Sequence, residues 1–140
     1  APRPRRMRRA FTLGLAALIL SACELLSGDF RVTGTVYLAS VLSERAPKTN
    51  VALFLVATNE GGVPVAVHRI VNPEFPASFE INHHDLLVPA LRRHEELSLH
   101  AEMNTHGAVG APRPGDLTGR APGTIHSGSR GVRVLIDKQR

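Results

Sequence analysis

The first 23 residues decide where a globular fold in this chain can begin. Five arginines between Arg3 and Arg9 precede an uncharged run, residues 10–22, which closes on small residues immediately before Cys23. A basic segment, an apolar segment and small residues, in this order, are typical of an export signal. The apolar run is shorter than the roughly 20 residues that a membrane-spanning helix needs. We therefore predict that residues 1–22 are a cleaved signal peptide and that the fold begins after them.

The end of this run, Leu20-Ser21-Ala22-Cys23, resembles the lipobox of bacterial lipoproteins. The resemblance implies that the signal is cut between Ala22 and Cys23, that the cysteine sulfur receives a diacylglycerol, and that the new amino terminus is acylated. Two or more acyl chains anchor a protein durably, whereas one chain binds a membrane only marginally. The alternative is an ordinary secreted protein with a free buried thiol. Met7 is the expected initiator, because residues 1–6 add nothing that the signal needs.

The lipoprotein resemblance also implies a location and a tether. It places the protein on the periplasmic face of a bacterial membrane, and Glu24 after the cysteine favours the outer membrane. Residues 23–30 are then the lipidated cysteine and its tether, and residues 31–140 are the folded domain.

Removal of the signal changes how the charge is interpreted. The chain has 17 basic and 12 acidic residues, and five of the basic residues are the signal arginines, which leaves 12 against 12. Nucleic-acid binding depends on clustered Lys and Arg that neutralise phosphates, so a nucleic-acid partner is not expected. The 117 residues after Cys23 suit one domain. They contain no cysteine, so packing and backbone hydrogen bonds, rather than disulfides, must stabilise the domain.

Short apolar segments separated by Gly and Pro predict an all-β domain. Most of these segments alternate apolar and polar residues, which is typical of half-buried strands. Residues 51–58 are almost continuously apolar and predict a central strand. The predicted strands are 31–38, 51–58, 63–71, 77–81, 95–103 and 131–137. We expect a small antiparallel β-sandwich of the Ig-like or Greek-key type.

The connections between these strands are also predictable in part. Residues 59–62, Asn-Glu-Gly-Gly, predict a hairpin turn, with Pro64 near a sheet edge or a strand start. Residues 83–92 fit either a helical turn or an irregular crossover that plugs one end of the core, and we prefer the crossover. Residues 106–129 are rich in Gly, Pro and Ser and predict a long ordered loop.

The seven histidines of the chain raise the hypothesis of a metal site. Zinc requires ligands that converge at about 2.0–2.1 Å for each nitrogen. His100 and Glu102 share a strand face and could chelate a metal together with His68 if the strands pair. The adjacent His83 and His84 would point to opposite sides of an extended chain. Exposed polar positions explain these residues equally well, so metal binding at His68 and His100 is the alternative rather than the leading prediction.

Catalytic residue types are present without a spacing that chemistry requires. Ser98, His100 and Asp116 supply the types of a nucleophile triad, but no G-x-S-x-G motif accompanies them. The carboxylates of Asp85, Glu95 and Asp116 are not paired across a substrate by anything in the sequence. We therefore predict that the protein is not an enzyme and needs no cofactor.

The most informative loop segment is Gly115-Asp116-Leu117-Thr118-Gly119. An aspartate in such a loop accepts hydrogen bonds from nearby backbone amides, and the two glycines permit a tight path. A structural staple is therefore the expected role of Asp116. The same loop could shape a binding edge, because functional residues often lie on loops that rigid strands support.

The order of the strands and turns resembles the periplasmic C-terminal domain of cytochrome c-type biogenesis proteins, over nearly all of residues 33–137. The segments that carry the resemblance are Gly34-x-Val36-x-Leu38, Leu53-Phe54-Leu55-Val56-Ala57, Pro64-Val65-Ala66-Val67-x-Arg69, Pro76-x-x-Phe79, Gly107, Gly115-Asp116-Leu117-x-Gly119 and Val134-x-Ile136-Asp137. In that family the domain is a non-catalytic β module on a membrane-anchored, helical-repeat protein that holds apocytochrome c for haem attachment.

Two departures separate this sequence from the family pattern. The helical repeats and transmembrane helices of the family have no counterpart in these residues. Where the family has an acidic, Met-containing segment after the fourth strand, this chain has Asn82-His83-His84-Asp85-Leu86-Leu87. Shared ancestry of the domain is thus a firmer implication than a shared role in holding apocytochrome.

These observations together predict a lipid-anchored, periplasmic, non-catalytic binding or assembly module. Its expected partner is a protein, such as a cytochrome maturation component, and its expected role is assistance to cytochrome c-type biogenesis. The alternative is a periplasmic lipoprotein that binds or delivers a metal. The predicted binding surface consists of Arg69, His83, His84, His106 and Asp116.

Overall fold

The computed structural model describes residues 29–92 and 94–140. The predicted signal peptide, Cys23 and most of the predicted tether lie outside the described residues. Within the described part of the chain, no helix is long and apolar enough to cross a membrane.

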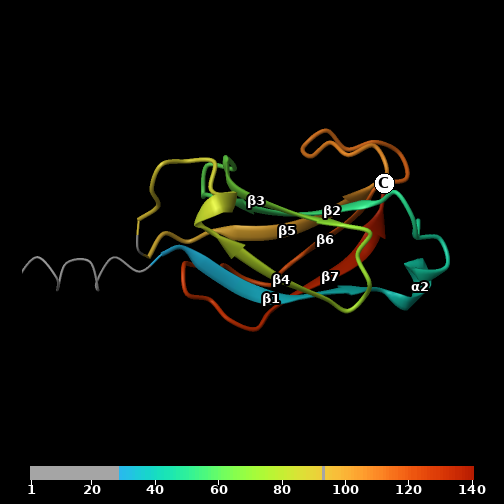
Figure 1. The fold of residues 1–140 in the computed structure, drawn as a ribbon, viewed down its shortest axis with the longest axis horizontal. Coiled ribbons are helices and arrows are strands. Elements are labelled where there is room, and N and C mark those ends of the chain that lie inside the picture. The colour runs from blue at the N-terminus through green and yellow to red at the C-terminus, as the bar shows by residue number, and fades with distance from the viewer. Residues whose placement is uncertain (1–28, 93) are drawn as a thin grey trace, which may run out of the picture.

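Strands make up nearly all of the regular structure of the domain (Figure 1). They are β1 (Arg31–Leu38), β2 (Ala52–Thr58), β3 (Pro64–Val71), β4 (Ala77–Asn82), β5 (Ser98–Asn104), β6 (Leu117–Arg120) and β7 (Val132–Gln139). A one-turn helix, α2 (Ser40–Ser43), follows β1, and a 3₁₀ turn, η1 (His83–Asp85), follows β4. The six predicted strands are all confirmed, whereas β6 is an additional strand.

The strands form one hydrogen-bonded sheet in the order β3-β2-β5-β6-β7-β1-β4. Figure 1 shows that the sheet folds over, so that β3, β2 and β5 form one layer and β7, β1 and β4 form the other. The predicted all-β sandwich is confirmed. One pair departs from the antiparallel expectation, because β1 and β7 run parallel. A parallel pair needs a long crossover, and here the rest of the domain supplies it.

The core lies between the two layers and is largely aliphatic. Period-two alternation brings one face of each strand inward, and the inward positions predicted for β1, β4, β5 and β7 are confirmed. The fully buried side chains include Val32, Leu53, Leu55, Ile81, Leu99, Met103 and Ile136. The continuous apolar run of β2 also follows the prediction, because this strand is hydrogen-bonded on both sides, to β3 and β5.

The prediction of an uninterrupted loop over residues 106–129 is wrong, because β6 lies in its middle. β6 pairs with both β5 and β7 and connects the two layers. Its sequence, Leu-Thr-Gly-Arg, is too short to display a period and contains a residue that disfavours strands. Gly119 is required there, because a Cβ atom at this position would collide with the backbone carbonyl of Leu135.

The segment after β4 closes the gap between the two edge strands, β3 and β4. It is irregular apart from η1, as predicted for a crossover. Leu86 forms an isolated bridge with Ala66, and the Leu87 N–H donates to the Val65 carbonyl at 2.9 Å. His68 Nδ1 lies 3.0 Å from Asp85 Oδ2 and adds a side-chain link across the same gap.

The close approach of β6 to β7 predicts that Gly119→Ala destabilises the domain. The added methyl group must displace backbone rather than a flexible side chain, which typically costs about 1–3 kcal/mol. Urea unfolding of the wild-type and variant proteins measures the loss. Gly61→Ala is the matched control, because a Cβ atom there meets only the Asn59 side-chain oxygen at 3.3 Å. Equal losses in the two variants would contradict the assigned packing of β6.

Candidate functional site

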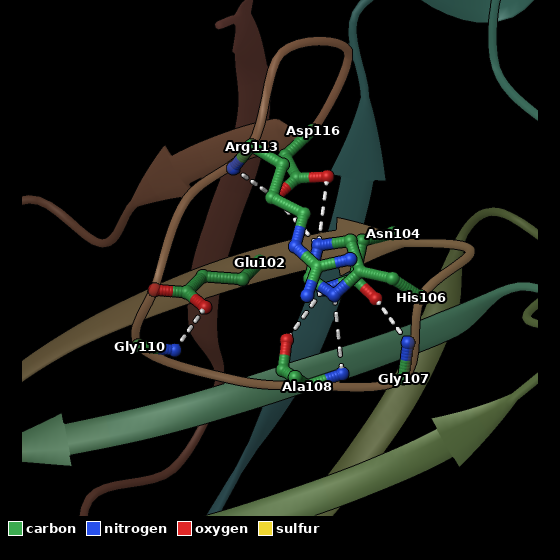
Figure 2. A network of polar contacts seen from close by, with 8 residues as sticks. All are labelled: Glu102, Asn104, His106, Gly107, Ala108, Gly110, Arg113 and Asp116. Atoms are coloured by element: carbon green, nitrogen blue, oxygen red, sulfur yellow. Dashed lines mark hydrogen bonds and ion pairs between the residues drawn. The ribbon is translucent and has the colours of Figure 1, made fainter.

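The loop of residues 105–116, between β5 and β6, is folded back and held by side chains (Figure 2). Asn104, at the end of β5, is only 3% exposed. Its Oδ1 accepts a hydrogen bond from the Gly107 N–H at 2.8 Å, and its Nδ2 donates to the Ala108 carbonyl at 2.9 Å. The side chain of Asn104 thereby fixes the first turn of the loop.

His106 and Asp116 join the two ends of this loop. His106 Nε2 lies 2.9 Å from Asp116 Oδ2 and 3.1 Å from Oδ1. The Ala108 N–H donates to His106 Nδ1 at 3.3 Å, which holds the imidazole ring in place beside the carboxylate. The Arg113 N–H also donates to Asp116 Oδ2, at 2.8 Å. Asp116 therefore has the stapling geometry that the sequence predicts.

The charge of Asp116 is favoured despite its burial. Asp116 is only 7% exposed, and this burial alone would raise the pKa of its carboxyl group. The hydrogen bonds from His106 and the Arg113 amide, with attraction from both residues, outweigh burial and hold the pKa of Asp116 below its ordinary value of 3.8. The ionised carboxylate is thus part of the folded loop.

Glu102 connects the loop to the outer face of the sheet. Its Oε2 accepts a hydrogen bond from the Gly110 N–H at 3.1 Å, as Figure 2 shows. Its Oε1 lies 3.3 Å from His100 Nε2, and the two side chains are only 17% and 24% exposed. Glu102 is therefore occupied on both oxygens by neighbours within the domain.

A hollow of about 500 Å³ lies beside Glu102, on the outer face of β5, β6 and β7. Thr118 occupies the middle of this face, opposite Glu102 on β5 and opposite Lys138 on β7. The pairing register shifts between Thr118 and Gly119, which marks a bulge in the β6–β7 pair. The residues that line the hollow are His100, Glu102, Thr118, Gly119, Arg120, Asp137, Lys138 and Arg140.

A second hollow, of about 600 Å³, lies between the β2–β3 turn and the segment that precedes β5. Its lining comprises Asn59, Glu60, Gly61, Arg92, His94, Glu95 and Glu96. Three glutamates outnumber the one arginine, and we call this the acidic hollow. Thr58 pairs with Ser98 where β2 ends and β5 begins, whereas Ala52 pairs with Asn104 at the other end of the same strands. The acidic hollow and the loop of residues 105–116 therefore lie at opposite ends of the sheet.

The residues of the predicted binding surface do not form one surface. His106 and Asp116 are brought together, and Arg69 lies on β3 opposite Phe54. His83 and His84 lie in η1, with ring centroids 3.9 Å apart. Figure 1 shows η1 and the loop before β6 at different ends of the domain. The prediction of a single edge is wrong, because β5 carries the chain along the sheet between these two segments.

The metal alternative at His68 and His100 also does not assemble. His68 is paired with Leu55, on the inward face of β2, whereas His100 is paired with Val56, on the outward face. Successive strand residues point to opposite faces, so the two histidines lie on opposite sides of the sheet. Within residues 29–92 and 94–140, no group of three or more His, Cys, Asp or Glu residues could hold a metal ion.

The residues considered for a nucleophile triad are separated in the same way. Asp116 is bonded to His106, whereas His100 is bonded to Glu102. Ser98 pairs with Thr58, at the far end of β5 from the loop of residues 105–116. Ser98, His100 and Asp116 therefore do not form a triad.

The sequence predicts the positions of only some of the polar groups beside the loop. The outward alternation of His100 and Glu102 along β5 was visible, but Arg120 could not be placed without β6. The role of Asn104 had no signal beyond its position at the end of an alternating strand. His100, Glu102 and Arg120 lie on one face, which can bind charged or hydrogen-bonding partners.

Comparison with known proteins identifies a related family. Residues 32–137 match the family described as the cytochrome c-type biogenesis protein H Ig-like domain. A protein of Aquifex aeolicus (strain VF5), named only as an uncharacterized protein, is 35% identical over 108 residues, which are 76% of this chain and 70% of that relative. No solved structure matches the chain significantly.

The lowered pKa of Asp116 predicts a loss of stability in acid. Because the folded-state pKa lies below the unfolded-state value of about 3.9, the contribution of this carboxylate is complete above that value and is lost as the pH falls through the folded-state pKa. Asp116→Asn should lower the free energy of unfolding at pH 7 by about 1–3 kcal/mol. The difference in the free energy of unfolding between the wild type and Asp116→Asn should become smaller in acid.

Urea unfolding between about pH 2.5 and pH 7 tests this expectation. Glu44→Gln serves as the control, because Glu44 is an exposed carboxylate beyond α2. A gap between the wild type and Asp116→Asn that stays constant across this range would contradict a role for the ionised carboxylate.

Proposed function

This chain belongs to the family of Ig-like domains of cytochrome c-type biogenesis protein H, and from that premise we propose that it assists cytochrome c maturation as a non-catalytic binding module. The observation that carries the proposal is the extent of the match, residues 32–137, which runs from β1 into β7. The matched unit is thus the whole sandwich rather than a single motif. A protein partner in maturation is the contact that this family relationship favours.

The proposal that the module is non-catalytic is supported by the separation of Ser98, His100 and Asp116, which do not form a triad. The polar side chains beside the loop of residues 105–116 instead bond to one another and to the backbone. His106 is bonded to Asp116, and His100 is bonded to Glu102, so each histidine already has a carboxylate partner. Asp116 and Glu102 also accept backbone N–H groups of the loop. These contacts order the loop, which suits a rigid binding surface.

Anchoring through lipid on Cys23 is the second part of the proposal. Its support is the motif Leu20-Ser21-Ala22-Cys23, together with the position of β1, which begins at Arg31. The start of β1 and the loop before β6 lie at different ends of the domain in Figure 1. An anchor on Cys23 would therefore leave the loop and the hollow beside it accessible to a partner, on the periplasmic face of the membrane. Glu24 favours the outer membrane.

Capture of the tagged protein from membranes tests the maturation role. An epitope tag belongs in the β2–β3 turn, residues 59–62, because a tag after Arg140 would lie near the candidate site: the Gly115 N–H donates to the Arg140 carbonyl. We expect cytochrome c or its maturation components to be enriched over capture with an unrelated tagged lipoprotein. Equal recovery of these proteins in both captures would count against the maturation role.

Lipidation is tested separately by metabolic labelling with a radioactive fatty acid. The wild-type protein should incorporate label and remain with membranes, whereas Cys23→Ser should do neither, because the thiol is the acceptor. Ser27→Ala, just outside the motif, is the matched control and should behave like the wild type. A wild-type protein without label would contradict the proposed anchor.

A further inference from the structure

The hollow on the outer face of β5, β6 and β7 carries three cationic side chains, those of Arg120, Lys138 and Arg140. All three residues are exposed. In the described part of the chain, the ion pairs are Arg31–Glu80, His68–Asp85, His100–Glu102 and His106–Asp116. None of these pairs involves the cations of the hollow, so their charges are available to a ligand.

The acidic residues of the hollow offset the charge of these three cations only in part. Glu102 is engaged by His100 and by the Gly110 N–H, and its side chain is 17% exposed. Asp137 is the one remaining carboxylate among the lining residues. The hollow therefore holds three cations against the two carboxylates of Glu102 and Asp137, which leaves it with a net positive charge.

The register of the strands explains why this surface is concave. Thr118 lies between Glu102 on β5 and Lys138 on β7, so a short side chain is flanked by two long ones. Arg120 lies two positions further along β6, opposite His100. The bulge at Thr118 and Gly119 increases the local twist of the sheet. The cationic side chains thus lie around the short Thr118 side chain, which forms the floor of the hollow.

The size and chemistry of the hollow select a class of ligand. Guanidinium groups bind carboxylates with two parallel hydrogen bonds, which gives geometric specificity. A volume of about 500 Å³ exceeds what a single carboxylate fills and accommodates several side-chain carboxylates of one segment. The ordered loop of residues 105–116 does not line the hollow, but its Gly110 N–H holds the lining residue Glu102 in place.

We propose that this hollow binds an acidic peptide segment of the protein partner. The inference rests on the proposed function only for the statement that the partner is a protein. The cations Arg120, Lys138 and Arg140 would contact its carboxylates, and the contact would weaken with salt because these side chains are exposed.

Binding of a defined peptide tests the inference directly. The protein is purified from membranes in detergent and titrated calorimetrically with hexaglutamate at low ionic strength, with hexalysine and inorganic phosphate as comparison probes. We expect saturable binding of hexaglutamate that weakens with added salt, and no binding of hexalysine. Absence of saturable hexaglutamate binding would overturn the inference, and tighter binding of phosphate would replace the peptide with a phosphate ligand.

Two charge-matched variants locate the binding site. Arg120→Gln with Lys138→Gln removes two cations of the hollow and should weaken hexaglutamate binding about fivefold or more. Arg45→Gln with Arg130→Gln removes two exposed cations elsewhere and should leave the affinity unchanged. Equal weakening in the two double variants would show a general charge effect and overturn the assignment to the hollow. Unfolding in urea verifies that both variants remain folded.

Capture from membranes separates this inference from the proposed function. If the wild type enriches maturation components and the Arg120→Gln, Lys138→Gln variant enriches them equally, the hollow is not the contact and the maturation role stands. If the wild type enriches none, the maturation role fails, and the peptide titration decides the hollow independently.

Discussion

The parallel pairing of β1 with β7 is the constraint on which the rest of the domain depends. Gly34 pairs with Val132 and Leu38 with Ile136, so the first and last strands lie side by side in one layer. Without this pair the sheet would separate into two pieces: β1 paired with β4, and the five strands β3, β2, β5, β6 and β7. Gly34 permits the contact, because a Cβ atom there would collide with the Val132 carbonyl and the Phe79 ring. Without a disulfide in the domain, this backbone pairing fastens the two ends of the sandwich.

Most of the fold could be predicted because the core strands repeat a simple pattern. Leu97, Leu99, Ala101 and Met103 alternate with polar residues, and all four are buried. β6 escaped prediction because Leu117 and Gly119 are its only buried positions and Gly119 has no side chain to reveal a period. Its existence is decided by the free edges of β5 and β7, which are contributed by distant parts of the sequence.

In the candidate site, contacts within one loop could be predicted from the sequence, whereas contacts between distant segments could not. Asp116 could be predicted as a staple, because a loop aspartate between glycines binds nearby amides whatever the tertiary fold. The grouping of His83 and His84 with His106 could not be judged in the same way, because it depends on which end of the sheet each loop occupies. His68 and His100 pair with adjacent residues of β2, Leu55 and Val56. This offset of one residue places the two histidines on opposite faces of the sheet.

Glu102 explains why the loop and the hollow act as one unit. One carboxylate oxygen holds the Gly110 N–H of the loop, and the other faces His100 on the wall of the hollow. A carboxylate used in this way leaves neither of its oxygen acceptors unpaired. The acidic hollow around Glu60, Glu95 and Glu96 lies at the opposite end of the sheet from the loop of residues 105–116. An acidic partner segment would meet the hollow of β5, β6 and β7 more favourably than the acidic hollow, because three cations outnumber two carboxylates in the first whereas three glutamates outnumber one arginine in the second.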